Sequence, residues 1–129
     1  EETPAVEWRF TDDWSAGDIA LDAPQVKQVL VNLLQNAVHA VSEREPAGGR
    51  VHLHVERTGD GVAFIIDDDG PGVPAIERAR IFTPFHSTRD QGTGLGLAIS
   101  ATIAQLHGGG ITVDDSPLGG ARFRVALSS

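Results

Sequence analysis

The sequence of 129 residues contains no cysteine and no methionine, and only 5% of its residues are aromatic. Without cysteine, a disulfide framework and a thiolate metal site are both excluded. No apolar run approaches the roughly 20 residues that a membrane-spanning helix requires, and no signal-peptide pattern opens the chain. Because the first residue is not methionine, we expect a fragment of a longer protein. The absence of cysteine suits a reducing interior, and we expect this fragment to lie in the cytoplasm without membrane contact of its own. Whether the longer protein is anchored in a membrane stays open.

Positive charge is also scarce, since 10 Lys and Arg face 18 Asp and Glu and give a formal net charge of −8. A surface of this sign repels the nucleic acid backbone, and no basic cluster offsets it, so nucleic acid is excluded as a partner. The same charge repels a triphosphate. A phosphate site in this chain therefore requires a divalent cation, backbone N–H groups and a few local cations.

The length and the 40% hydrophobic content predict a single domain over residues 1–129 with one core. Alternating and helical hydrophobic patterns predict its elements. An edge strand is expected at 6–10, with 18–21 as its hairpin partner. Two further hairpins are expected, one of 51–55 with 62–67 and one of 111–114 with 121–127. Helices are expected at 23–43, 74–80 and 94–107, and a loop at 81–93. This order predicts an α+β two-layer sandwich, with about five strands in a mixed, mostly antiparallel sheet under about three helices.

Two asparagines stand four residues apart on the first predicted helix. At about 100° per residue, Asn32, Asn36 and His39 fall on one stripe at the border of the apolar arc, together with Gln25 and Glu43. Each half-buried amide needs a partner, and a nearby backbone group is the structural alternative. An Asn carbonyl oxygen is a hard, neutral ligand that suits Mg²⁺ already carrying phosphate oxygens and waters. A carboxylate there would bind the metal more strongly but would repel the anionic substrate.

An acidic glycine run follows the predicted central strand. Asp68 ends this strand and precedes Gly70 and Gly72. The run could simply be a turn, whereas the spacing excludes an EF-hand calcium loop. A carboxylate at the end of a central strand can accept a hydrogen bond from an exocyclic amine, and the glycines let backbone approach a flat ring. Adenine has such an amine, and guanine has none at the matching position.

A glycine-rich loop at 92–97 precedes the last predicted helix. It matches neither a Walker loop nor the dinucleotide fingerprint. Exposed N–H groups at a helix start nevertheless form an anion site, and Arg89 just ahead could supply a cation. The structural alternative is a glycine-rich start to a packed helix.

Five motifs in this order resemble those of the catalytic ATP-binding domain of sensor histidine kinases, in the Bergerat-fold (GHKL) superfamily. They are 28–40, 68–72, 81–88, 92–97 and 119–123, and the resemblance spans nearly the whole chain. It implies Asn36 as the Mg²⁺ ligand, Asn32 near metal and phosphates, and Asp68 on the adenine amine. The catalytic residues it implies are Asn32, Asn36 and Arg89. The residues it implies for binding ATP, or the product ADP, are Asn32, Asn36, His39, Asp68, Gly70, Gly72, Val73, Phe82, Phe85, Thr88, Arg89, Gly92, Thr93, Gly94, Leu95, Gly96 and Leu97.

The resemblance also bears on the reaction. Hydrolases of the superfamily carry Glu, the general base for water, at the position of Asn32, and an amide cannot accept that proton. The implied reaction is donation of the γ-phosphoryl group to a histidine on the protein's own helical dimerisation domain, with a response regulator downstream. None of the histidines in this chain has a phosphoacceptor context, and little turnover is expected from the fragment alone. The alternatives are an ATPase or serine kinase in which nucleotide drives association, a module that only senses adenine nucleotide, and a structural module without nucleotide.

Overall fold

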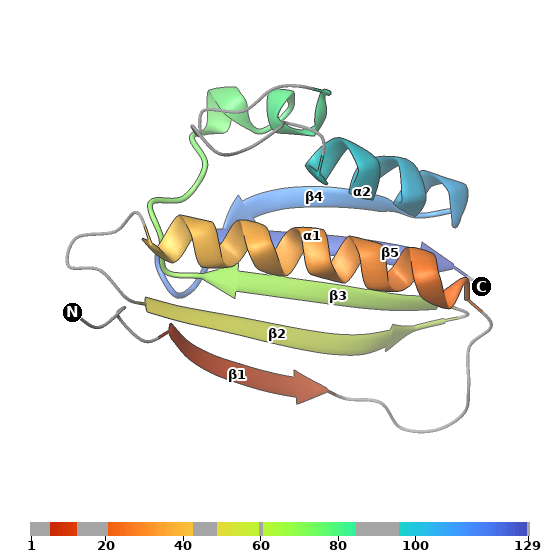
Figure 1. The fold of residues 1–129 in the computed structure, drawn as a ribbon, viewed down its shortest axis with the longest axis horizontal. Helices are drawn as coiled ribbons and strands as arrows, with labels where there is room; N and C mark the ends of the chain where they lie inside the picture. Colours follow the sequence, from red (N-terminus) through yellow and green to blue (C-terminus); the bar gives the residue numbers. More distant parts are fainter. Residues whose placement is uncertain (1–5, 13–20, 43–48, 60, 85–95, 129) are drawn as a thin grey trace.

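The computed structural model describes residues 6–12, 21–42, 49–59, 61–84 and 96–128. They form a sheet with helices over one of its faces (Figure 1). The strands are β1 Val6–Asp12, β2 Gly49–Thr58, β3 Gly61–Asp68, β4 Gly110–Asp115 and β5 Ala121–Ser128. The helices are α1 Ala23–Ser42 and α2 Gly96–Leu106, with two 3-10 helices, η1 Ala75–Glu77 and η2 Arg80–Phe82.

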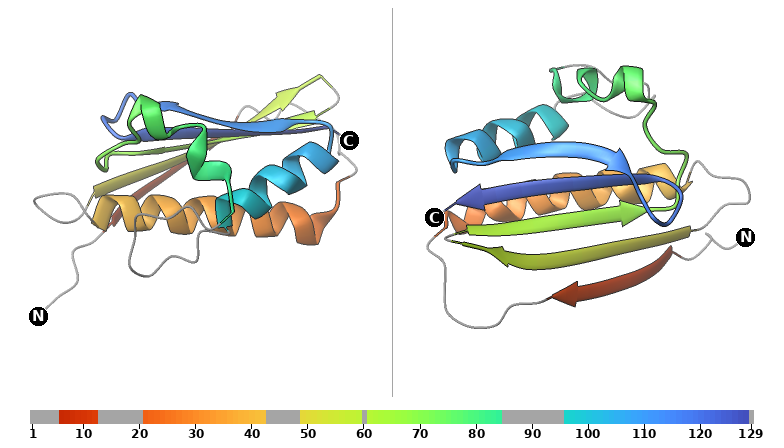
Figure 2. Two further views of the ribbon diagram at one scale, coloured as in Figure 1. Left: turned by 90° about the horizontal axis from the view of Figure 1, so that it is seen from above. Right: turned by 180° about the vertical axis from the view of Figure 1, so that it is seen from behind.

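The sheet has the strand order β1-β2-β3-β5-β4. The pair β1–β2 is parallel, and the pairs β2–β3, β3–β5 and β4–β5 are antiparallel. Figure 2 shows α1 and α2 on the same face, whereas none of the helices in the described ranges covers the opposite face. This mixed, mostly antiparallel two-layer sandwich confirms the predicted fold class. No helix among the described residues is both long and apolar enough to cross a membrane.

The helix α1 follows its sequence signals closely. The backbone N–H of Gln25 donates to Asp22 Oδ1 at 3.0 Å, so Asp22 caps the helix as its position predicts. Val29, Leu33, Ala37 and Val41 recur at helical spacing and are all fully buried. They pack in one cluster with inward-facing strand residues, among them Val51, Phe64, Ile66, Phe123 and Val125. This single apolar layer fixes α1 across the middle of the sheet.

The hairpins predicted at 51–55 with 62–67 and at 111–114 with 121–127 are present as β2–β3 and β4–β5. Gly108 ends α2 with φ +71°, and the N–H of Gly109 donates to the carbonyl of Ala104 at 2.9 Å. This is the left-handed helix end that the glycine run at 108–110 predicts. The first two residues of the helix predicted from 94 lie outside the described residues, and α2 begins at Gly96.

The predicted helix at 74–80 is wrong in type and extent, as is the loop predicted from 81. Two short 3-10 turns stand there instead, η1 and η2, closed by bonds such as Glu77 N–H to the Pro74 carbonyl at 2.8 Å. The second turn ends at Thr83, which is extended at ψ 147°. Because Pro84 follows, Thr83 is kept out of the helical region. The segment is thus too interrupted for an α-helix.

The edge strand β1 is longer than predicted and runs parallel to β2. Thr11 Oγ1 forms hydrogen bonds with His52 Nε2 at 2.9 Å and His54 Nδ1 at 2.6 Å, which tie the two strands together. Of the hairpin partner predicted at 18–21, residues 18–20 lie outside the described residues, and Leu21 is not in a strand.

Candidate functional site

Three elements meet at one end of the sheet, where β3 ends and β5 begins beneath the C-terminal half of α1 (Figure 1). Asp68 is the last residue of β3, and its side chain is buried at 1% exposure. The turn at 69–72 follows it and lies against α1, since a Cβ at Gly70 would stand 2.7 Å from the carbonyl oxygen of Ala40. The Asp68 carboxylate is therefore enclosed by backbone from both layers.

The two oxygens of Asp68 differ sharply in their surroundings. Oδ1 accepts hydrogen bonds from the N–H groups of Gly70 at 2.9 Å and Ala121 at 3.2 Å. Oδ2 is buried and has no hydrogen-bond partner in the described part of the chain. Burial raises the pKa of Asp68, the two N–H donors oppose this, and the charges of Asp69 and Asp67 add to it. A buried acceptor without a donor is costly in a folded protein, so Oδ2 is suited to a donor that arrives with a ligand.

Glycines shape the backbone around this carboxylate. A Cβ at Gly120 would strike Asp68 Oδ1 and would lie 2.6 Å from both the Asp68 carbonyl oxygen and the Gly70 nitrogen. Gly120 also donates its N–H to the Asp68 carbonyl at 3.1 Å, and Gly72 has φ +79°. Gly120 was not among the predicted site residues. The sequence feature that could have identified it is the pair of glycines at 119 and 120, at the start of the motif 119–123.

Asn32 forms a second cluster, between the two helices. Its Nδ2 donates to the Gly96 carbonyl at 3.1 Å and to Ser100 Oγ at 3.3 Å, and its Oδ1 accepts from Gln28 Nε2 at 2.9 Å. Ser100 is fully buried. Asn32 therefore fastens the first turn of α2 to α1. Sequence reasoning missed Ser100, because its partner lies 68 residues away.

The helix α1 joins these clusters. Asn36 and His39 are half-buried, as the helical stripe predicts, between Asn32 at one cluster and Ala40 at the other. Eight residues of helix separate Asn32 from Ala40, a span of about 12 Å, which is comparable to the length of a nucleotide. Asn36 thus occupies the middle of a line that runs from the start of α2 to Asp68.

The remaining predicted residues divide into two groups. Val73, Phe82 and Leu97 are partly buried against the core, and Phe82 meets Phe123 edge to face with ring centroids 6.3 Å apart. The others lie outside the described residues: Phe85, Thr88, Arg89, Gly92, Thr93, Gly94 and Leu95.

On the uncovered face, beside Asp68, an ion pair between a buried carboxylate and a partly exposed guanidinium joins the same two strands. Asp67 is 3% exposed and accepts from Arg122 through both carboxylate oxygens, at 2.8 and 3.0 Å. Since Asp67 and Arg122 are cross-strand neighbours, this bidentate pair holds β3 and β5 in the register that places Ala121 N–H on Asp68.

A sheet with its helices on one face, and a buried carboxylate beside glycine turns at the end of a central strand, define a class of open-faced α/β sandwich domains. Residues 21–129 match the family model described as histidine kinase-, DNA gyrase B- and HSP90-like ATPase, and the chain belongs to this family.

Sensor proteins are among the relatives. The chain is 42% identical over 111 residues to the alginate biosynthesis sensor protein KinB of Pseudomonas aeruginosa, covering 84% of this chain and 18% of that protein. It is 42% identical over 103 residues to the C4-dicarboxylate transport sensor protein DctB of Rhizobium meliloti, covering 80% of this chain and 16% of that protein. The chain thus spans less than a fifth of these relatives.

Solved structures agree with this assignment. The catalytic domain of histidine kinase ThkA, in a nucleotide-free form, superposes with a TM-score of 0.84 at 32% identity, over 95% of this chain and 78% of that one. Full-length ShkA in complex with AMPPNP gives a TM-score of 0.80 at 32% identity, over 95% of this chain and 25% of that one. The resemblance to histidine kinase catalytic domains that the five motifs indicated is confirmed.

Proposed function

We propose that this chain binds ATP with Mg²⁺ and presents the γ-phosphoryl group to a histidine on a separate helical dimerisation domain. The observation that carries the proposal is the buried Oδ2 of Asp68, which has no hydrogen-bond partner among the described residues and lies beside glycine-lined backbone. The exocyclic amine of adenine is a donor of the required kind. ShkA, which has the same fold, is described in complex with AMPPNP.

The base would lie against the turn that follows Asp68. Oδ2 would accept from the adenine amine, while Gly70, Gly72 and Val73 would form the adjoining wall. Because Oδ1 is already held by two backbone N–H groups, the carboxylate cannot rotate without losing them. Its orientation thus favours a base with an amine at this position over guanine.

The phosphates would extend along α1 toward the start of α2. Mg²⁺ would neutralise the phosphate charge when bound, and Asn36 would hold it through one neutral oxygen, which suits an ion that prefers oxygen ligands. Asn32 positions the first turn of α2 through Gly96 and Ser100, where backbone N–H groups attract an anion. The further residues proposed to surround the nucleotide are His39, Phe82, Phe85, Thr88, Arg89, Gly92, Thr93, Gly94, Leu95 and Leu97.

Transfer is favoured over hydrolysis by the bonding of Asn32. Both ends of its amide are engaged within the protein, and an amide has no basicity with which to activate water. Catalysis then consists of positioning and charge neutralisation. The acceptor histidine would belong to the helical domain of the longer protein, in the cytoplasm, with a response regulator downstream. A structural neighbour, ThkA, is described in complex with the response regulator TrrA.

Two measurements test the proposal. Calorimetry with ATP, GTP and Mg²⁺ should show binding of ATP and much weaker binding of GTP. Incubation with labelled ATP should transfer phosphate to a supplied helical domain that carries the acceptor histidine. Rapid steady-state ATP hydrolysis by the isolated chain, abolished by Asn36→Ala, would instead support a hydrolase.

A further inference from the structure

The chain leaves the sheet after Asp68 and, beyond the turn at 69–72, passes through η1 and η2. One side chain ties this segment back to the sheet. Arg78 Nε donates to the carbonyl of Val73 at 3.0 Å, and its Nη2 donates to Asp115 Oδ1 at 2.6 Å. Its Nη1 lies 3.8 Å from Asp114 Oδ1. The side chain is 27% exposed, so its stem packs while its planar head reaches two parts of the chain.

Each of these two parts is connected along the chain to a segment that binds Asp68. Val73 ends the turn that begins beside Asp68. Asp115 is the last residue of β4, and the connection from it leads to Gly120 and Ala121, whose N–H groups bind Asp68. Arg78 therefore spans from one wall around the carboxylate to the base of the other.

We infer that Arg78 is a positioning residue for the adenine pocket: it holds the Val73 carbonyl and the end of β4 at a fixed separation without touching the nucleotide. This role rests on the proposed function. Asp114 and Asp115 are 71% and 89% exposed, and exposed ion pairs contribute little to global stability. The contact of Arg78 therefore affects the position of the Val73 carbonyl and of the turn before it more than the free energy of unfolding.

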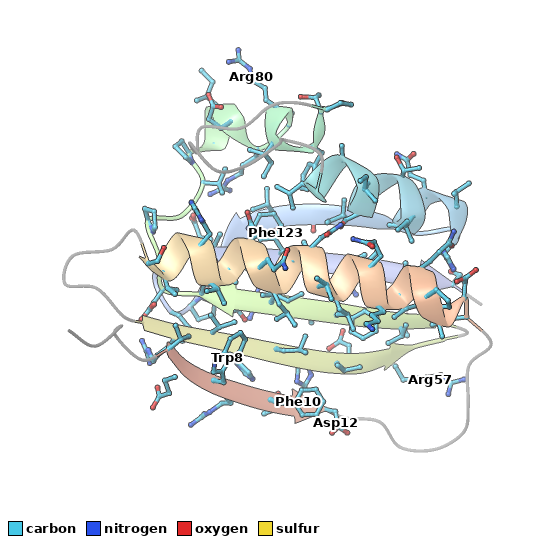
Figure 3. All side chains as sticks on the ribbon, in the orientation of Figure 1. Trp8, Phe10, Asp12, Arg57, Arg80 and Phe123 are labelled. Atoms are coloured by element: carbon cyan, nitrogen blue, oxygen red, sulfur yellow. The ribbon has the colours of Figure 1, made fainter. Side chains whose placement is uncertain are left out.

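A neighbour provides a matched control. Arg80 carries the same charge two residues away, is 62% exposed, and has Glu77 as its ion-pair partner at 3.7 Å. Figure 3 shows Arg80 extending outward from the 3-10 segment, away from the sheet. Arg80→Ala changes the net charge equally but leaves the Val73 turn intact.

The experiment compares wild type, Arg78→Ala and Arg80→Ala for binding of adenosine, ADP and ATP at fixed Mg²⁺, by calorimetry and NMR titration. Arg78→Ala should weaken all three by the same factor, about three- to tenfold, because ordering the base wall is the shared cost. Arg80→Ala should stay within about twofold of wild type. Asp115→Ala should reproduce part of the loss and add nothing to Arg78→Ala. The melting temperature of the ligand-free protein should be nearly unchanged in all variants.

Three results would overturn this role. The first is an unchanged ATP affinity in Arg78→Ala. The second is a loss of affinity that grows from adenosine to ATP, because such a loss reports attraction of the arginine charge to the phosphates. The third is a fall in melting temperature that accounts for the weaker binding. Wild type that binds none of the three ligands would instead remove the proposed function itself.

Discussion

Replacement of Asp68 by Asn tests the central carboxylate with almost no change in shape. The Asn oxygen can keep the hydrogen bonds from the N–H groups of Gly70 and Ala121. The amide nitrogen then takes the place of Oδ2 and points two donors at the amine of adenine. Turning the amide over would restore an acceptor for adenine but would oppose donors to the two backbone N–H groups. Asn therefore cannot satisfy both sets of partners.

The magnitude follows from the bond that is lost. A hydrogen bond to a charged group is worth about 1.5–3 kcal/mol, and each 1.4 kcal/mol is about tenfold in affinity. Asp68→Asn should thus weaken ATP binding roughly 10- to 150-fold. Stability should change little by comparison, because removing a buried charge gains about 1.4 kcal/mol per unit of raised pKa, while an unsatisfied amide donor costs about 1–3 kcal/mol.

The pH dependence has a definite sign. Burial raises the pKa of Asp68 above its ordinary value of 3.8, so the unfolded chain loses this proton first as the pH rises. Between the two pKa values the folded state holds more protons, and the free energy of unfolding falls as the pH increases through this window. ATP affinity should move oppositely and fall as the pH drops through the raised pKa, since protonated Asp68 offers the adenine amine a worse acceptor.

Calorimetric titration of ATP and of purine riboside triphosphate, which lacks the exocyclic amine, isolates the bond. Wild type should prefer ATP, and Asp68→Asn should bind the two ligands about equally. Circular dichroism melts confirm that the variant is folded at the temperature of the titration. ATP binding by Asp68→Asn within about twofold of wild type, or an equal loss for both ligands, would refute the role given to Oδ2.

Three further substitutions, with Gly110→Ala as a control for the last of them, separate the metal, the helix contact and the backbone. Asn36→Ala should lower ATP affinity about tenfold when Mg²⁺ is present and much less when it is chelated, which paired titrations with and without EDTA would show. Asn32→Ala removes the donor to Gly96 and Ser100, so urea unfolding should give a free energy of unfolding lower by about 1–2 kcal/mol; an unchanged value would mean that these contacts do not hold α2. Gly120→Ala forces a Cβ onto Asp68 and should destabilise by about 1–3 kcal/mol or more, whereas Gly110→Ala, where a Cβ meets nothing within 4 Å, should leave the melting temperature nearly unchanged.

The elements that the sequence predicts well are those whose causes are local. The Asp22 cap and the 3.6-residue spacing of buried positions define α1, and glycine turns define both hairpins. By contrast, the parallel pairing of β1 with β2 joins segments about 40 residues apart, and no local pattern encodes it. The same holds for β5 lying between β3 and β4. The helix predicted at 74–80 was wrong because the segment divides into two 3-10 turns at 75–77 and 80–82, and Pro84 keeps Thr83 out of the helical region.

The site shows the same division. The sequence identifies Asp68 and the glycines after it from their spacing, and it places Asn32 and Asn36 at the border of the apolar face. It does not reveal that Gly120 and Ala121 complete the surroundings of Asp68, or that Arg78 reaches from Val73 to Asp115. These contacts join positions 37 to 53 residues apart or depend on irregular backbone, so the folded chain alone brings them together.

The half-satisfied bonding of Asp68 explains why a costly group persists in the core. Were this residue only part of a turn, both oxygens would be expected to find donors, since buried polar groups in native proteins nearly always do. Here one oxygen holds the backbone of two segments, and the other has no partner among the described residues. A ligand that supplies the missing donor stabilises the fold through mass action, by about 2.7 kcal/mol at a concentration 100 times its Kd. The rise in melting temperature with ATP should consequently be smaller in Asp68→Asn than in wild type, in step with its roughly 10- to 150-fold lower affinity, and an equal rise in both proteins would contradict the role of this carboxylate.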